Sequence, residues 1–168
     1  MKILFKTSLL IVTVAVFFAA CTPVEHKELG APRKIVESLN GTWKLINAKQ
    51  VDEDASRKGF PFKELDITNL FPYTNFVLKL DLAGGAPSSF TTTPGSSPRI
   101  IKLASGTWAV ENIDNPKDIT LTNGATTEKI TLGGYPVGAA STLKLKVERK
   151  DASTGKLLIT YSYEFAKQ

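Results

Sequence analysis

The stretch LKLKVERKDASTGKLLITYSYEF, residues 143–165, decides the fold class. Apolar residues occupy alternate positions on both sides of the polar segment Asp151–Gly155, first from Leu143 to Val147 and again from Leu157 to Phe165. A period of two places successive side chains on opposite faces of a strand, and a turn rich in Asp, Ser and Gly joins antiparallel neighbours. The stretch therefore predicts a β-hairpin with one buried and one solvated face.

The same period recurs along the chain in segments that Gly, Pro, Asn and Asp separate. These segments lie at residues 42–48, 76–82, 108–110, 119–121, 130–132, 143–147 and 157–165. Seven to nine short strands, with no long amphipathic helix among them, predict an all-β chain that forms an antiparallel barrel or sandwich. One short helix is expected at residues 33–39, between Pro32 and Asn40-Gly41.

Two segments depart from the alternation. In residues 61–72 the apolar side chains are three to five positions apart, which favours a short helix or turn that closes one end of the domain. Residues 84–98 are rich in Gly, Pro, Ser and Thr, which indicates a loop or a broken edge hairpin in which residues 90–93 form a short strand. One domain is expected, because the chain is too short for two separate cores.

The N-terminus carries a targeting signal. Lys2 and Lys6 precede an apolar run from Leu9 to Phe18, and Ala19-Ala20 leads into Cys21, the only cysteine. Basic, apolar and small-residue regions in this order are typical of a secretory signal peptide. The apolar stretch is shorter than the roughly 20 residues that a membrane span needs. We therefore expect a cleaved signal rather than a permanent membrane helix.

This N-terminus resembles the signal peptide and lipobox of bacterial lipoproteins; an ordinary secretory signal with an incidental cysteine is the alternative. The resemblance implies cleavage before Cys21, a diacylglycerol on its sulfur and usually a third acyl chain. Two or three chains would hold the protein durably on a membrane, because each buried methylene contributes ~0.8 kcal/mol. We expect a signal peptide at residues 1–20, a flexible tether at 21–32 and a barrel domain at 33–168, lipid-anchored to the outer membrane and facing the periplasm or the exterior.

Composition argues against several function classes. Without residues 1–20 the chain has 21 − 2 = 19 basic residues against 16 acidic ones, and the cations are spread along it. A nucleic-acid partner is therefore not expected, because it requires cations gathered on one stripe. Lys144 and Lys146 alternate with apolar residues and indicate a solvated strand face. The single histidine, His26, lies in the tether, so His- and Cys-based hydrolysis, zinc sites and haem ligation are not expected.

The acidic clusters mark no catalytic or metal site. Asp52-Glu53-Asp54 and residues 111–118 lack the spacing of a calcium loop, and Asx-turns between strands account for them. Nothing marks a pair of carboxylates for glycoside hydrolysis. We expect a protein that is not an enzyme and has no catalytic residue, metal or cofactor.

Gly-Thr-Trp occurs twice, at residues 41–43 and 106–108, each time at the start of an expected strand. Glycine permits a close backbone approach, and the tryptophan two positions later supplies a large apolar plug. The first copy, LNGTWKL at residues 39–45, resembles the Gly-x-Trp opening of the lipocalin family, including the short helix before it.

The mature chain as a whole is similar to the lipocalin-like domains of unknown function in lipoproteins of Bacteroides-type bacteria. Those domains also carry a second Ser-Gly-Thr-Trp, here residues 105–108, after a stretch like LDITNLF at 65–71. The resemblance covers about residues 37–167 and implies an antiparallel, lipocalin-like up-and-down β-barrel of about eight strands with a short N-terminal helix. The chain departs from lipocalins in having no Thr-Asp-Tyr element and no clear arginine after the last strand to stack on Trp43.

Aromatic residues on the expected strands are the candidate ligand contacts. Trp43, Phe76, Trp108, Tyr161 and Tyr163 could wall a pocket for a small apolar or glycan ligand at an open barrel end, or they could fill the core. Two functions therefore remain. The first is a lipid-anchored barrel that binds such a ligand, and the resemblance favours it. The alternative is an interaction module with a filled core that docks on an envelope protein through loops such as residues 84–98.

Overall fold

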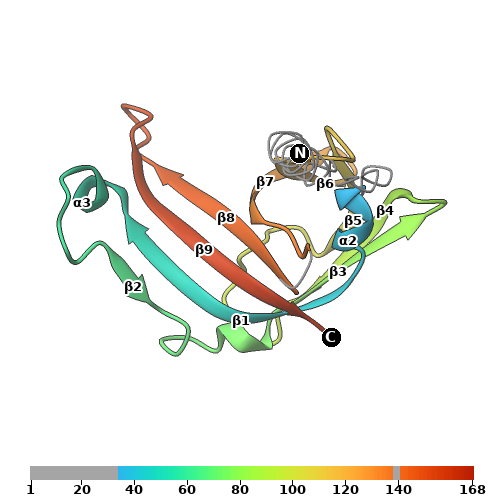
Figure 1. Cartoon of the computed structure of the whole chain (residues 1–168), viewed down its shortest axis with the longest axis horizontal. Coiled ribbons are helices and arrows are strands. Elements are labelled where there is room, and N and C mark those ends of the chain that lie inside the picture. The colour runs from blue at the N-terminus through green and yellow to red at the C-terminus, as the bar shows by residue number, and fades with distance from the viewer. Residues whose placement is uncertain (1–33, 138–140) are drawn as a thin grey trace, which may run out of the picture. The chain divides into compact units, whose positions relative to one another are not determined.

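Hydrogen bonds between the first and the last strand close one antiparallel sheet into a barrel (Figure 1). The computed structural model describes residues 34–137 and 141–168. Eight strands follow one another around the barrel in sequence order. They are β1 (Gly41–Asp52), β3 (Val77–Ala83), β4 (Ala86–Thr93), β5 (Ser105–Val110), β6 (Asp118–Asn123), β7 (Thr126–Gly134), β8 (Thr142–Lys150) and β9 (Leu157–Lys167). The predicted all-β, up-and-down barrel of eight strands is confirmed.

Short elements lie beside the barrel within the described residues. They are α2 (Ile35–Leu39), α3 (Glu53–Arg57), β2 (Glu64–Asp66) and the 3-10 helix η1 (Tyr73–Asn75). The predicted helix before Gly41 is α2, and it packs Val36 and Leu39 into the core. In the part of the chain that the structure describes, no helix has the length and apolar character needed to cross a bilayer. The predicted signal peptide and tether, with Cys21, lie outside the described residues.

Two segment predictions were wrong in detail. Residues 84–98 contain a complete barrel strand, β4, which pairs with both β3 and β5 instead of forming a loop or an edge hairpin. Pairing on both sides outweighs the Gly and Pro residues of this segment, its threonines favour a strand, and Phe90 supplies the buried side chain. Of the short helix or turn predicted for residues 61–72, the turn is present at residues 68–72 and the helix is not. Residues 64–66 instead form the strand β2, which pairs with the C-terminal half of β1.

The hairpin of β8 and β9 has the predicted antiparallel pairing. A carboxylate oxygen of Asp151 accepts hydrogen bonds from the backbone N–H of Ser153 and Thr154, at 3.0 and 2.8 Å, which stabilises the turn. β9 also pairs with β1 from Trp43 to Asp52, which is the contact that closes an up-and-down barrel.

Buried side chains from every barrel strand fill the interior. The buried apolar residues on these strands are Trp43, Leu45, Ala48, Leu78, Leu80, Phe90, Trp108, Ile119, Leu121, Ile130, Leu143, Leu145, Tyr163 and Phe165. The strand period alternates these inward residues with outward polar ones, as the sequence pattern predicts.

The long strands continue beyond the rest of the barrel. β1 pairs with β3 only over residues 41–44 and with β2 over residues 49–51, whereas β9 accompanies β1 over residues 43–52. We call the part with strand order β2-β1-β9-β8 the projecting sheet. Figure 1 shows α3 and β2 at its far end, opposite the end at which α2 lies. The chain therefore enters the domain at one end and exposes β2 at the other.

Candidate functional site

Trp43 is fully buried where β1 begins. Its indole Nε1 donates a hydrogen bond to the carbonyl oxygen of Leu39, at 2.8 Å, and so ties the strand to α2. The ammonium of Lys167 lies 5.5 Å from the ring centroid, within the range of a cation–π contact. The chain has no clear arginine after the last strand to stack on Trp43, and the lysine at the end of β9 makes this contact instead.

Trp108 occupies an equivalent place at the second Gly-Thr-Trp. It is buried, and its Nε1 donates to the carbonyl oxygen of Asp81 on β3, at 2.7 Å. Phe76 is also buried and packs edge-on against Phe165, with 6.3 Å between the ring centroids. Both tryptophans thus have their polar N–H satisfied inside the same apolar core.

Tyr163 and Tyr161 share one face of β9 and stack at 6.3 Å. Tyr73 of η1 packs against Tyr163 at 6.0 Å, and Phe71 packs edge-on against Tyr73 at 5.9 Å. Burial raises the pKa of both the Tyr163 and the Tyr73 hydroxyl above 10.0, the ordinary value, so these phenols stay protonated. The four rings form a continuous aromatic row that links the surface at Phe71 to the core.

The structure brings the five predicted ligand contacts into one core. Trp43, Phe76, Trp108 and Tyr163 are at most 5% exposed, and only Tyr161 is partly accessible. Their neighbours are other core side chains, so the barrel is filled around them. Their role in ligand binding stays a prediction, and the packing favours the alternative in which they serve as core.

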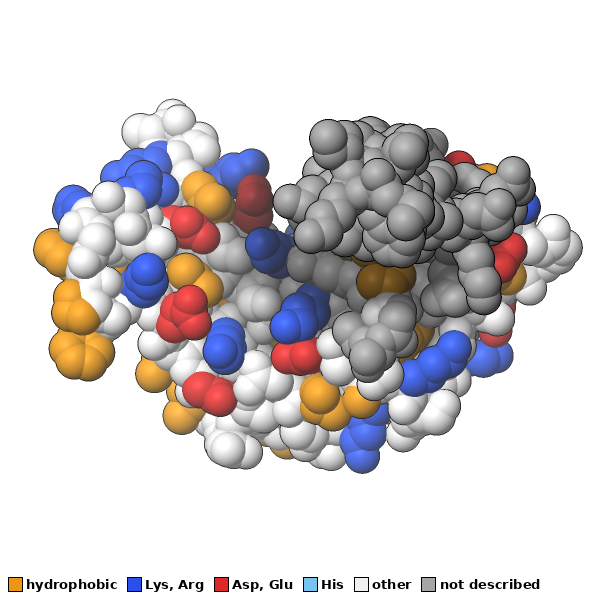
Figure 2. All heavy atoms as spheres, viewed as in Figure 1, with side chains coloured by type: hydrophobic (Ala, Val, Ile, Leu, Met, Phe, Trp, Pro, Cys, Tyr) orange, Lys and Arg blue, Asp and Glu red, His pale blue; other side chains and the backbone are white. Residues whose placement is uncertain are grey.

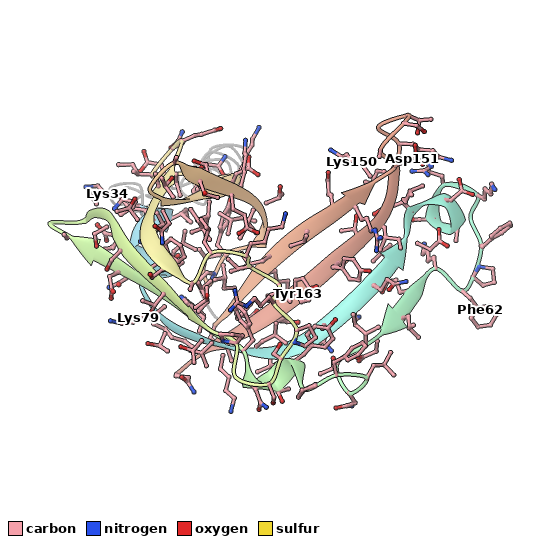
Figure 3. The ribbon with its side chains drawn as sticks, turned by 180° about the vertical axis from the view of Figure 1, so that it is seen from behind. Lys34, Phe62, Lys79, Lys150, Asp151 and Tyr163 are labelled. Atoms are coloured by element: carbon pink, nitrogen blue, oxygen red, sulfur yellow. The ribbon has the colours of Figure 1, made fainter. Side chains whose placement is uncertain are left out.

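Five large apolar side chains in one short stretch of the chain are exposed, and none of them is among the predicted ligand contacts. Phe60, Phe62, Leu65, Leu70 and Phe71 lie within twelve consecutive residues, and they are 53% to 93% exposed. We call residues 60–71 the apolar edge segment. Figure 2 shows hydrophobic side chains along this edge of the molecule, and Figure 3 shows Phe62 projecting from the end opposite Lys34.

Polar contacts on both sides hold the apolar edge segment in place. Asp52 caps α3 by accepting from the N–H groups of Asp54 and Ala55, each at 2.9 Å. Asp54 in turn pairs with Lys58 at 2.6 Å and with Lys156 of the β8–β9 turn at 2.9 Å, and hydrogen bonds from these two lysines lower its pKa. The segment is therefore anchored to the β8–β9 turn as well as to β1.

Contacts after β2 fix the other side of the segment. Thr68 Oγ1 accepts from the N–H of Ala48 at 2.9 Å, and Asn47 Nδ2 donates to Asp66 at 3.2 Å. Hydrogen bonds from Thr68 and Asn47 keep the pKa of Asp66 below its ordinary value. Ile67 is buried in the core beside these groups. The exposed rings thus belong to a backbone that is hydrogen-bonded to the barrel.

The outer face of the projecting sheet is charged. A hollow of about 350 Å³ lies there, lined by residues that include Lys49, Lys144, Lys146, Glu64 and Glu164. Lys49 is 3.8 Å from Glu64, and Lys144 is 3.5 Å from Glu164. The positive and negative charges of this face therefore largely neutralise each other. This arrangement agrees with the predicted solvated face and does not concentrate one sign of charge.

The acidic clusters have structural roles. Asp52 caps α3, whereas Asp54 forms ion pairs. The side-chain oxygen of Asn112 accepts from the N–H of Asp114 at 2.8 Å and of Asn115 at 3.2 Å. These two hydrogen bonds form an Asx-turn at Asn112, within the acidic cluster at residues 111–118 for which such turns are predicted. Among residues 34–137 and 141–168, no group of three or more side chains of the metal-binding types comes together.

The sequence contained one usable signal for the apolar edge segment. Phe60-Pro61-Phe62 and Leu70-Phe71-Pro72 place large apolar residues beside prolines, outside any alternating pattern, so these residues have no strand face through which to be buried.

Comparison of the chain with protein-family models and with curated proteins gives no match to either.

Proposed function

We propose that the protein is a non-enzymatic outer-membrane lipoprotein, anchored through acyl chains on Cys21, whose lipocalin-like barrel docks on another envelope protein through the apolar edge segment. The observation that carries the docking function is the exposure of Phe60, Phe62, Leu65, Leu70 and Phe71 on a fixed backbone. The anchor rests on the sequence pattern before Cys21.

The free energy of burying apolar side chains favours binding of a partner to this surface. Fully burying a Leu or Phe side chain is worth about 1.5–3 kcal/mol, and these five residues are more than half exposed. Single exposed apolar residues are common, whereas five large ones within twelve consecutive residues make this segment a candidate interaction site. A partner that covers them would recover most of that free energy.

The placement of the segment fits an anchored protein that reaches outward. β1 has 12 residues and runs from the α2 end toward α3, a span of roughly 36–40 Å. Because the proposed tether joins the domain at Lys34, the apolar edge segment lies at the opposite end (Figure 3). Within the described residues, the segment is therefore remote from Lys34, the point nearest to the proposed anchor.

The burial of the predicted ligand contacts supports docking on a protein more than it supports binding of a small ligand. An open barrel end would leave several of those aromatic rings accessible to a ligand, and four of the five are buried. Native mass spectrometry of the protein extracted from its own envelope separates the two functions. A retained small molecule would support ligand binding, whereas a stable protein adduct would support docking.

Photo-crosslinking tests the docking surface directly. A benzophenone amino acid at position 62 should give a discrete protein adduct in intact cells, because Phe62 is 93% exposed. The same group at Ile113, which is 43% exposed and whose carbonyl oxygen accepts from Val36 of α2, is the matched control. Equal adducts at both positions, or lipid adducts alone at position 62, would contradict docking on a protein.

A further inference from the structure

We infer that the partner adds an extended strand to the free edge of β2 and presents basic residues opposite Glu64 and Asp66, with an apolar residue between them. This inference rests on the proposed docking function and specifies the chemistry of the partner. It combines three features of one short strand: an unpaired edge, two acidic side chains and adjacent exposed apolar residues.

The edge of β2 offers backbone hydrogen bonds. Among residues 34–137 and 141–168, β2 is the last strand of the sheet and β1 is its only partner. On the β1 side, the N–H of Asp52 donates to the carbonyl of Lys63 at 2.8 Å, and the N–H of Ile67 donates to the carbonyl of Ala48 at 2.9 Å. Because bonding alternates along an antiparallel strand, the backbone N–H and C=O of Glu64 and Asp66 are directed away from β1.

Side-chain charge disfavours a second copy of this chain as the added strand. When two β2 edges pair antiparallel, the residues whose backbone groups face outward lie opposite one another. Every such register places Glu64 or Asp66 opposite Glu64 or Asp66 of the other copy, and like charges directly opposite are destabilising. Acidic residues on an edge are a known device against self-association.

The same charges favour a basic partner strand. Glu64 is 52% exposed at its side chain and is held only loosely, 3.8 Å from Lys49. Asp66 keeps its negative charge because Thr68 and Asn47 donate to its carboxylate, and β2 is exposed at all three residues. Opposite-charge pairs directly across two strands are stabilising. A partner with Lys or Arg at alternate positions meets both acids on the same face.

The exposed apolar residues beside β2 indicate that its charged edge does more than prevent aggregation. An edge that serves only to prevent aggregation is short and charged, without bare apolar side chains beside it. Leu65 is 54% exposed on the face opposite the acids, and Phe62 precedes the strand almost fully exposed. An apolar residue between two basic ones would lie on the Leu65 face, so one alternating strand satisfies both faces of β2.

Synthetic peptides test this inference on the detergent-solubilised, full-length protein. The probes are a fluorescent peptide of alternating Lys and Val, the same peptide with Glu in place of Lys, and the Lys/Val peptide N-methylated at alternate amides on its bonding edge. Fluorescence anisotropy should give a Kd at least about tenfold lower for the first peptide than for either of the others. N-methylation keeps the charge but removes backbone donors, so it separates strand addition from simple charge attraction.

Charge reversal supplies the matched variants. Glu64→Lys with Asp66→Lys should reverse the preference toward the Glu/Val peptide, whereas Glu111→Lys with Asp114→Lys makes the same change of charge at other exposed acids and should leave it unchanged. Circular dichroism checks that each variant is folded.

Each outcome decides the inference. Equal binding of the N-methylated peptide, or the same response of both double variants, would overturn strand addition in favour of general charge attraction. No binding of the Lys/Val peptide would also overturn it. In either case the crosslink at position 62 reports independently on the proposed function, because it requires only proximity to a protein. Lipid adducts there would mean that the occupant is a membrane.

Discussion

Replacement of Gly106 by alanine tests whether the second Gly-Thr-Trp serves a close backbone approach. Gly106 has a φ of +151°, and an added Cβ would lie 2.0 Å from the carbonyl oxygen of Thr122 on β6 and 3.1 Å from a ring carbon of Phe90. Thr122 pairs with Thr107 in the β5–β6 ladder, and Phe90 is fully buried. Neither atom can yield without disturbing the pairing or the core.

The expected cost combines two effects. A side chain at this φ costs about 1–3 kcal/mol in backbone strain. Overpacking against the neighbouring backbone adds about 1–3 kcal/mol. Gly106→Ala should therefore lower the free energy of unfolding by about 4 kcal/mol, out of a total of about 5–15 kcal/mol. For a domain of this size each kcal/mol lowers Tm by roughly 3–5 °C, so Tm should fall by about 12–20 °C.

Gly41→Ala is the matched control in the first Gly-Thr-Trp. Gly41 also has a positive φ, +132°, but an added Cβ would meet the Cε atom of Lys167 at 2.6 Å. The end of a lysine side chain can move aside, so mainly the strain of about 1–3 kcal/mol remains. Thermal unfolding followed by circular dichroism compares the two variants. If Gly106→Ala is no more destabilising than Gly41→Ala, the close approach to Thr122 does not limit stability and the reasoning fails.

Three further predictions concern the anchor, the core and the acid limit of stability. Cys21→Ser should abolish palmitate labelling and leave an unacylated product; persistent labelling would refute the lipid anchor. Trp43→Ala should lower the free energy of unfolding by ~3–5 kcal/mol in urea denaturation, because a fully buried ring is removed, while Lys167→Ala should cost only about 0.5–2 kcal/mol for the lost cation–π contact. Lys129, 2.9 Å from Asp118, holds the pKa of that carboxyl below 3.8, its ordinary value. The resulting stabilisation is complete above the ordinary pKa and is lost as the pH falls through the lower folded pKa, so Asp118→Asn should flatten the drop in Tm between about pH 5 and pH 2; an unchanged slope would show that this pair does not contribute.

Local patterns determined the architecture of the barrel. The alternation in residues 143–165 predicted the β8–β9 hairpin because a period of two is a property of the strand itself, and the turn at Asp151 is stabilised by neighbours within three residues. The place of α2 before Gly41 followed from equally local signals. These elements could be predicted because the interactions that specify them are close in sequence.

Only the tertiary structure decided which apolar residues are buried and which remain in water. The alternating pattern cannot distinguish a filled barrel from an open one, since both place Trp43, Phe76 and Trp108 inward, and burial depends on side chains from all eight strands. Residues 64–66 form a strand because β1 extends past β3 and offers an edge for them to pair with, and that edge depends on the lengths of strands far apart in the sequence. The exposure of Phe62 follows from that same long-range pairing, because no other part of the described barrel reaches the far end of the projecting sheet to cover it.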